Sequence, residues 1–240
     1  LYIDRMRGFL NSAAYPYSRD DPENWDDRLK KIKMMGIDVV SFYVPWRHHV
    51  IKSGGEYTVD FDGRTRTSRN VKLFAELCAK NALCMTVKPG PFIHAETNYG
   101  GLPDWVCPEE DPEVEPFTDS KGYQHRWLPH SGRMVPAPLS GKFKRLVKEW
   151  FGLVDTNILK DNVYPKGNVI AVQVCNEGLY SDLPNLITDF DYSPSALSLY
   201  RKFAKVPRNS QVPRDISTLK TRSGLKEYLK WAGWQSEFMG

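Results

Sequence analysis

The sequence predicts an α/β fold in which helices cover a parallel sheet. Short, nearly uninterrupted apolar runs are typical of strands buried on both faces, and amphipathic segments of helical period separate them. The units recur at intervals of about 30 residues or more, the length that right-handed βαβ crossovers need. An open doubly wound sheet and a (β/α) barrel both fit this pattern. No glycine-rich dinucleotide loop follows a predicted strand, which counts against a nucleotide-binding version.

The first predicted helix lies between two predicted strands. Residues 8–15 (GFLNSAAY) are the first candidate strand, and residues 37–44 (IDVVSFYV) form the second, bounded by Gly36 and Pro45. Between them, residues 25–35 place apolar side chains at spacings of three and four, which predicts one buried helix face. That face comprises Trp25, Leu29, Ile32 and Met35.

The alternation continues along the chain. Residues 70–80 and 143–158 are predicted helices, each with an apolar face, and residues 82–87 (ALCMTV) and 169–174 (VIAVQV) are predicted strands. The stretch 91–139 is rich in Pro, Gly, Trp and acidic residues. It is too long for a passive connection, so we expect it to form part of a site.

Composition excludes several classes of protein. With 240 residues, of which 12% are aromatic, the chain is not disordered, and no apolar run approaches the roughly 18–20 residues of a membrane helix. Residues 201–240 carry nine Lys or Arg against three acidic residues, but at helix-like intervals. A solvated helix face explains this better than nucleic-acid binding. The chain starts with Leu1, as expected for a processed product or a fragment, and both cytoplasmic and secreted locations fit.

The cysteines do not indicate a metal site. They show no CxxC spacing, and three of them lie in apolar runs, so we expect buried free thiols. Disulfide pairing stays open, because spacing alone does not decide it. The four are Cys78, Cys84, Cys107 and Cys175.

Polar side chains gather where the predicted strands end, which is where parallel α/β folds place functional groups. Glu177 directly follows an apolar strand, where it fits a general acid and a helix cap about equally well. Glu96 has the same placement one strand earlier, and neighbouring strands lie ~4.8 Å apart. The same strand ends also offer Tyr43, Trp46, Lys88, His94, Asn98, Tyr99, Gln173, Asn176 and Tyr180.

Two carboxylates with aromatic neighbours are typical of a sugar site, because aromatic rings stack on a sugar while one acid protonates the glycosidic oxygen. Core packing is the alternative for the aromatic residues, which are Tyr43, Trp46, Tyr99 and Trp105.

Three other features are weaker candidates. Residues 60–63 (DFDG) open like a calcium loop but lack its later Glu. His48 and His49 would point apart on a strand, so a metal pair is not expected. The acidic cluster 109–115 is expected to be a solvated loop.

Four segments resemble the N-terminal part of the catalytic domain of glycoside hydrolase family 35, the β-galactosidases and their close relatives. These are WDDRLKKIKMMGIDVVSFYVPW, GEYTVDFDG leading into NVKLFAELC, KPGPFIHAETNYGGLPDWV and VIAVQVCNEGLY. The resemblance implies a (β/α)8 TIM barrel of which residues 1–240, as one catalytic domain, cover roughly the first half. It also implies that Glu177 is the general acid/base, that Asn176 contacts the sugar 2-hydroxyl, and that Tyr43, Ala95 and Glu96 contact the sugar. The nucleophile is then a Glu on a later strand, and no segment of residues 178–240 matches its motif.

The sequence departs from the family pattern near the implied sugar site, with His94 where Cys is usual and Lys88 where Arg is usual. We therefore expect a divergent retaining exo-β-glycosidase, β-galactosidase-like or with another specificity such as glucosaminidase. Its substrate is expected to be an oligosaccharide or glycoside, with no metal or organic cofactor and with an oligomer allowed. The rival hypotheses are a degenerate carbohydrate-binding barrel and a non-hydrolytic enzyme that uses Glu96 and Glu177 as a proton-transfer pair. Because the nucleophile is missing, residues 1–240 alone are expected to be inactive.

Overall fold

The structure is a computed structural model that describes residues 2–3, 6–7, 9–94, 97–127, 132–176, 191–208 and 222–239. The chain divides into two compact units. The first comprises the described parts of residues 1–102 and 150–176, and the second those of residues 103–149 and 177–240.

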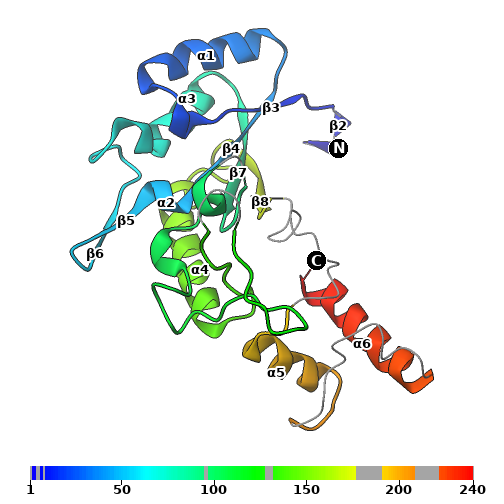
Figure 1. The fold of residues 1–240 in the computed structure, drawn as a ribbon. Coiled ribbons are helices and arrows are strands. Elements are labelled where there is room, and N and C mark those ends of the chain that lie inside the picture. Colours follow the sequence, from blue (N-terminus) through cyan, green and yellow to red (C-terminus); the bar gives the residue numbers. More distant parts are fainter. Residues whose placement is uncertain are drawn as a thin grey trace. The chain divides into compact units, whose positions relative to one another are not determined.

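The first unit is built on a four-stranded parallel sheet (Figure 1). Its strands are β3 (Ser12–Ala14), β4 (Val39–Tyr43), β7 (Cys84–Gly90) and β8 (Val169–Val174), and they lie side by side in that order. Each strand therefore pairs in parallel with the strand that precedes it in the sheet. This arrangement confirms the predicted α/β class with a parallel sheet.

Two helices, α1 (Pro22–Met34) and α3 (Val71–Lys80), pack against each other beside the sheet (Figure 1). Asp21 caps the start of α1 by accepting a hydrogen bond from the Glu23 N–H, and Asn70 caps α3 in the same way. Their apolar faces join the strands in an aromatic core. That core includes Tyr17 of the short helix η1 (Tyr17–Arg19) together with Trp25, Phe42 and Phe74.

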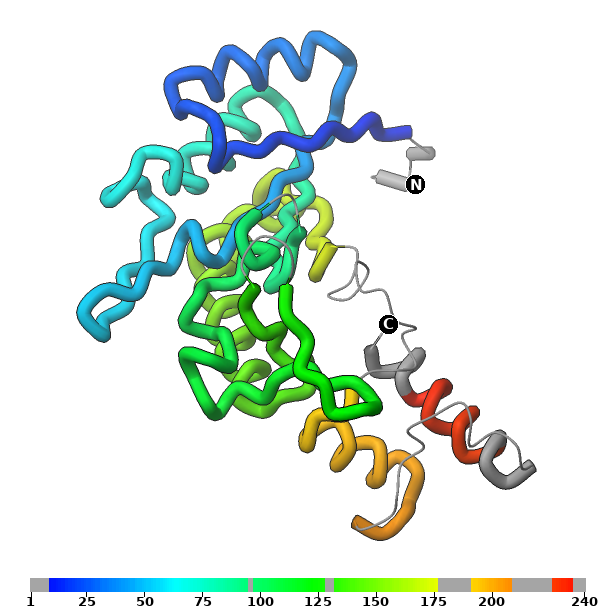
Figure 2. The backbone as a smooth tube through the Cα atoms, in the orientation of Figure 1, coloured from blue at the N-terminus to red at the C-terminus, as the bar shows by residue number. Residues whose placement is uncertain are grey.

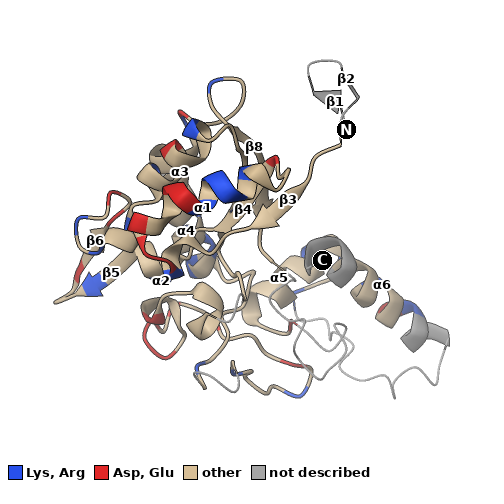
Figure 3. Ribbon diagram, turned by 90° about the horizontal axis from the view of Figure 1, so that it is seen from above, with Lys and Arg blue, Asp and Glu red and all other residues tan. Residues whose placement is uncertain are grey.

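The outward side of α1 is charged (Figure 3). Asp26 and Lys30 form an ion pair of 2.8 Å, and Asp27 and Lys31 form one of 2.6 Å, both at the i, i+4 spacing. Such exposed pairs contribute only about 0.3–0.5 kcal/mol each. The buried aromatic face, rather than these ion pairs, fixes the helix to the sheet.

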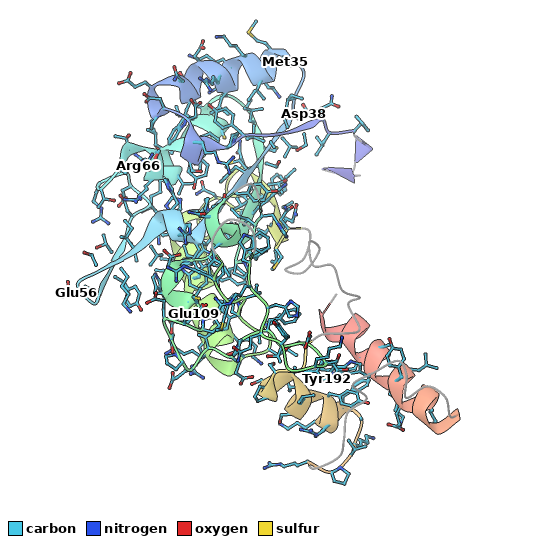
Figure 4. All side chains as sticks on the ribbon, in the orientation of Figure 1. Met35, Asp38, Glu56, Arg66, Glu109 and Tyr192 are labelled. Carbon is cyan, nitrogen blue, oxygen red and sulfur yellow. The ribbon has the colours of Figure 1, made fainter. Side chains whose placement is uncertain are left out.

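The predicted elements of the sheet are present, but β3 spans only Ser12–Ala14 where residues 8–15 were predicted, and one residue of the predicted α1 face is wrong. Strand β8 matches its predicted bounds, and α3 buries Val71, Phe74 and Cys78 as expected. Met35 was predicted to lie on the buried face of α1, but the helix ends at Met34 and the Met35 side chain is 77% exposed (Figure 4). The cause is Gly36, whose φ of 80° turns the chain away before another helical turn forms.

A β-hairpin follows β4 that the apolar pattern did not indicate. Strands β5 (Val50–Ser53) and β6 (Glu56–Val59) pair antiparallel around a two-glycine turn and project from the unit (Figure 2). A short helix, α2 (Trp46–His49), precedes them, and η2 (Thr67–Arg69) follows. Near the N-terminus, β1 (Tyr2–Ile3) and β2 (Met6–Arg7) form a second antiparallel pair.

Helix α4 (Gly141–Val154) continues into a π-helical turn, η5 (Asp155–Leu159), and together they cover the predicted helix 143–158. In the first unit, Trp150 of this helix stacks on Trp46 with 5.7 Å between ring centroids. Its Nε1 also donates a hydrogen bond of 2.7 Å to the Pro89 carbonyl. Trp150 is thereby fixed to the end of strand β7.

The second unit combines the loop after residue 102 with two helices, α5 (Pro194–Phe203) and α6 (Arg222–Met239). The helices share a buried aromatic cluster of Tyr192, Tyr200, Trp231 and Trp234. The loop includes η4 (Asp104–Val106) and short antiparallel bridges such as Thr118 with Gln124. Across the described residues, no helix is both long enough and apolar enough to span a bilayer.

Candidate active site

The carboxyl ends of the parallel strands form one edge of the sheet in the first unit. Tyr43, the last residue of β4, lies in register with Lys88 of β7. Gly90, the last residue of β7, lies in register with Val174 of β8. Side chains that follow these positions therefore belong to the same edge, which is where barrel enzymes place their catalytic groups.

Tyr43 and Lys88 are in contact at this edge. The Lys88 ammonium lies over the Tyr43 ring, with its Nζ atom 5.0 Å from the ring centroid, and both residues are half-buried. This is the geometry of a cation–π interaction. Tyr43, expected to contact sugar, thus has a cationic neighbour on the adjacent strand.

The Asn176 side chain is held by both ends of its amide. Its Nδ2 donates a hydrogen bond of 3.1 Å to the Ile93 carbonyl, and its Oδ1 accepts one of 3.3 Å from Gln173 Nε2. The backbone N–H of Cys175 also donates to the Gly90 carbonyl at 2.9 Å. The segment after β8 is therefore tied to the end of β7 and to the loop that follows it.

The two halves of the GPFIHAE…GGLPDW motif fold onto each other around η3 (Asn98–Gly101). Ile93 N–H donates to the Gly100 carbonyl at 2.8 Å. Gly100 has a φ of 57°, and a methyl group in place of its hydrogen would overlap the Phe92 ring. Gly101 packs in a similar way on Ile93. The glycine pair is therefore required by a close approach as well as by backbone conformation.

Two of the predicted site residues are described by the structure, and three lie outside the described ranges. Tyr43 and Asn176 lie at the same edge of the sheet, as the sequence predicted. Ala95, Glu96 and Glu177 lie outside the described residues. Glu177 is nevertheless the next residue in the chain after Asn176, whose side chain and backbone neighbours are fixed.

Two of the four aromatic candidates belong to the core instead. Trp46 is 2% exposed and stacks on Trp150, and Tyr99 is 1% exposed. Tyr43 is half-buried, and Trp105, in the second unit, is also only partly buried. Core packing, the alternative left open by the sequence, is therefore correct for Trp46 and Tyr99.

His48 and His49 lie on helix α2, not on a strand, because the chain turns directly after Pro45. His49 is fully buried, with Tyr17 Oη 2.6 Å from its Nε2 and the Asp60 carbonyl 2.7 Å from its Nδ1. Burial lowers the pKa of His49 to about 3, so the ring is neutral at physiological pH. Its role is to join η1 to the loop after β6. In the described part of the chain, no cluster of His, Cys, Asp or Glu is arranged to hold a metal.

The Asp60 carboxylate closes its own loop. One oxygen accepts hydrogen bonds from the N–H groups of Asp62, Gly63 and Arg64, and the other accepts from the Thr65 N–H and hydroxyl. Burial opposes ionisation, but these hydrogen bonds outweigh it and hold the pKa of Asp60 well below its usual range. The calcium-like opening at residues 60–63 is therefore a hydrogen-bonded turn.

The acidic cluster 109–115 lies in a loop with Glu109, Glu110 and Glu113 exposed, as expected, and it also forms ion pairs and hydrogen bonds within the second unit. Glu109 pairs with Arg126 at 2.6 Å, and Lys142 pairs with Asp111 and Glu113. Glu115 accepts hydrogen bonds from the Ser195 N–H and hydroxyl at the start of α5. The sequence pattern missed these pairs because their partners lie 17 to 80 residues away.

All four cysteines are free, as expected. Cys78 and Cys107 are buried, whereas Cys84 and Cys175 are only partly buried. Burial raises the pKa of the Cys175 thiol, which keeps it protonated beside Asn176.

Comparison with known proteins gives a consistent result. The model of the family described as glycosyl hydrolases family 35 matches residues 1–137. A β-1,2-glucosyltransferase from Ignavibacterium album is 32% identical over 200 residues, which are 81% of this chain and 26% of that protein. A β-galactosidase-1-like protein from Mus musculus is 31% identical over 191 residues, 79% of this chain and 24% of its own length. The chain thus spans about a quarter of the length of each of these two relatives.

A solved structure also resembles the chain. The crystal structure of a β-galactosidase from the psychrophilic Marinomonas ef1 superposes with a TM-score of 0.55 at 13% sequence identity. The match covers 82% of this chain and 25% of that one. This likeness, with the family match, confirms the predicted TIM-barrel class, of which the described sheet contains four consecutive strands.

Proposed function

This chain belongs to glycosyl hydrolases family 35, and from that premise we propose that the protein containing it is a retaining exo-acting β-glycosidase. Its substrates are terminal non-reducing β-linked sugars, with β-galactosides favoured. The observation that carries the proposal is Asn176. Its amide is fixed at the carboxyl edge of the sheet, beside the loop after β7, and Glu177 is the next residue.

Glu177 is the general acid/base of the proposed reaction. In the first step it donates a proton to the glycosidic oxygen while the C1–O bond breaks and a nucleophilic carboxylate bonds to C1. In the second step the Glu177 carboxylate removes a proton from water, whose oxygen attacks C1 and releases the nucleophile. The two carboxyl groups of a retaining enzyme lie ~5–5.5 Å apart. The nucleophile is proposed to lie on a later strand, outside residues 1–240.

Tyr43, Ala95, Glu96 and Asn176 are proposed to bind the sugar. Tyr43 supports this assignment because it is half-buried at the strand ends, where an aromatic ring can contact both the apolar face and the hydroxyls of a sugar. An amide held by both of its ends, as in Asn176, keeps one N–H and one lone pair in a fixed direction. Such preorganisation lowers the cost of binding.

Transfer to a sugar acceptor is a second candidate function. It is favoured by the 32% identity to the Ignavibacterium album protein, which is named a β-1,2-glucosyltransferase. The chemistry differs only in the second step, where a sugar hydroxyl rather than water gives its proton to Glu177 and attacks C1. Residues that exclude water from the intermediate would decide between the two.

The test is a screen of the full-length protein with 4-nitrophenyl β-galactoside, β-glucoside and β-glucosaminide, with and without added disaccharide acceptors. Release of nitrophenol with free sugar identifies a hydrolase, whereas release with a lengthened oligosaccharide identifies a transferase. Sugar binding without release identifies a degenerate barrel. Absence of both binding and release contradicts the proposal and leaves the non-hydrolytic enzyme that uses Glu96 and Glu177.

A further inference from the structure

Lys88 lies within a strand of the parallel sheet, an unusual position for a lysine. It occupies β7 in register with Tyr43, so both side chains lie on the same face of the parallel sheet. The opposite face carries Phe42 and Val87, which are 1% and 0% exposed and belong to the core with α1 and α3. Lys88 and Tyr43 therefore lie on the face turned away from these helices, near its carboxyl edge.

The Lys88 ammonium has an aromatic neighbour and no carboxylate partner among the residues that the structure describes. Several other lysines are paired: Lys30 with Asp26 at 2.8 Å and Lys72 with Asp62 at 2.7 Å, for example. The face of an aromatic ring attracts a cation electrostatically, but it is a poor acceptor for the hydrogen bonds that an ammonium donates. An ammonium has three donors, so at least two remain for oxygen ligands.

The surroundings indicate what those ligands are. An aromatic ring beside a fixed hydrogen-bond donor is the combination that binds a sugar, because the ring covers C–H groups while the donor reaches a hydroxyl. Thr86 and Ser41 precede Lys88 and Tyr43 on the same face and are small and neutral. No second cation or aromatic residue among these register neighbours competes for the site.

We propose that Lys88 is a substrate-binding residue whose ammonium, held over Tyr43, donates a hydrogen bond to a hydroxyl of the bound sugar. The proposal rests on the proposed function, since it assigns a further contact in the same site. It makes Lys88 a determinant of which sugar is accepted. A sugar whose hydroxyl lies within hydrogen-bond reach of the Lys88 ammonium is bound. A stereoisomer without a hydroxyl at that position leaves the half-buried cation without an oxygen ligand.

The experiment compares Lys88→Met, Lys88→Arg and a matched control in the full-length protein. The control is Lys52→Met, because Lys52 also lies over a tyrosine, with Nζ 5.4 Å from the Tyr57 centroid, but on the β5–β6 hairpin. Thermal unfolding of each variant is recorded first. The kcat/KM values are then measured on the preferred aryl β-glycoside and on its monodeoxy analogues.

Lys88→Met is expected to lower kcat/KM by about 10–100-fold, as loss of a hydrogen bond from a charged group does. On one monodeoxy analogue the effect should shrink to about 3-fold or less, because the contacted hydroxyl is already absent. Lys88→Arg should recover part of the activity, and Lys52→Met should match the wild type.

An equal loss on all analogues would show that Lys88 acts only through Tyr43, and a Lys88→Met variant as active as the wild type would exclude any role. A wild-type preference for uronides that is lost in Lys88→Met would overturn the assignment to a hydroxyl, because the ligand of the ammonium would then be a sugar carboxylate. If the wild type hydrolyses no glycoside, the proposed function fails, and Lys88 is tested by calorimetry with galactose and glucose. Weaker binding to Lys88→Met than to Lys52→Met supports the assignment, and equal or absent binding overturns it.

Discussion

The side chain of Asn176 donates a hydrogen bond of 3.1 Å to the carbonyl of Ile93, a residue 83 positions earlier in the chain. This contact joins the end of β8 to the loop that follows β7. It connects two of the segments that carry the family resemblance, GPFIHAE and AVQVCNE. In this structure the second motif is therefore anchored to the first at the edge of the sheet.

Replacing Glu177 by Gln in the full-length protein is expected to lower kcat on natural disaccharides by roughly 10²–10⁴-fold, the usual contribution of general acid–base catalysis. The loss should be smaller on dinitrophenyl glycosides, whose leaving group needs no proton. Steady-state kinetics on both substrate types measure the difference. Unchanged kcat on disaccharides would show that another residue protonates the leaving oxygen.

Glu96 is expected to bind sugar and not to attack it. A mechanism-based fluorosugar, which stops the reaction at the covalent intermediate, should therefore label a peptide outside residues 1–240. Peptide mass spectrometry identifies the labelled carboxylate. A label on Glu96 would make Glu96 and Glu177 the catalytic pair and contradict the assignment above.

Gly100→Ala is expected to destabilise the loop after β7 far more than Gly54→Ala. The two glycines have φ values of 57° and 59°, so both variants carry the same left-handed strain. A Cβ at residue 54 meets open space, whereas one at residue 100 overlaps the Phe92 ring. The difference in free energy of unfolding should be on the order of 1–3 kcal/mol, as in overpacked cores.

Denaturant titration measures this effect in four proteins. They are the wild type, Gly54→Ala, Gly100→Ala and the double variant Gly100→Ala/Phe92→Leu. Shortening the side chain at residue 92 should return part of the lost stability. Equal destabilisation by the two single glycine variants would mean that backbone strain alone explains the glycine at residue 100.

Stability is expected to fall as the pH drops below the usual His pKa of about 6.5. The pKa of His49 is lowered to about 3 by burial, so the unfolded chain binds a proton between these values that the folded chain does not. His49 thus contributes up to ~1.4 kcal/mol of lost stability per pH unit within that window. The His49→Gln variant, which does not titrate, should show a flatter profile in chemical unfolding from pH 7 to 4. Parallel profiles would contradict a neutral buried His49.

Residues 1–240 expressed alone are expected to be inactive on aryl β-galactosides and to self-associate. On strand β8, Ile170, Val172 and Val174 are 36%, 44% and 61% exposed, and within the described sheet β8 pairs on one side only. Open, apolar sheet edges favour association. Analytical ultracentrifugation with an activity assay tests both statements. A monomer of this span that releases nitrophenol would place the nucleophile within it.

The parallel strands were predictable because their apolar runs are local. Residues 169–174 are recognisable without knowing their neighbours, and Asn70 marks the start of α3 by its capping chemistry alone. The hairpin of β5 and β6 was less evident, since its strands alternate only weakly, although Gly54 and Gly55 form a typical two-residue turn.

The errors arise where long-range packing decides. Trp46 and Tyr99 had the residue type and position of sugar contacts, but Trp46 stacks on Trp150 and both are buried in the core. His49 was considered on a strand although Pro45 ends the predicted strand at residue 44, and the structure places it on helix α2 directly after that proline. The pairing of Lys88 with Tyr43 depends on sheet register, which the order of predicted strands suggests but does not fix.

The overlap that any side chain at residue 100 would make with Phe92 also has an evolutionary consequence. A mutation of Gly100 costs less stability in a lineage that has first acquired a smaller residue at position 92, so the order of the two substitutions matters. In descendants of this sequence a change at residue 100 should therefore follow a change at residue 92. Tyr43 and Lys88, the proposed sugar contacts, are not among the atoms that a side chain at residue 100 would overlap, so they are expected to vary without that dependence.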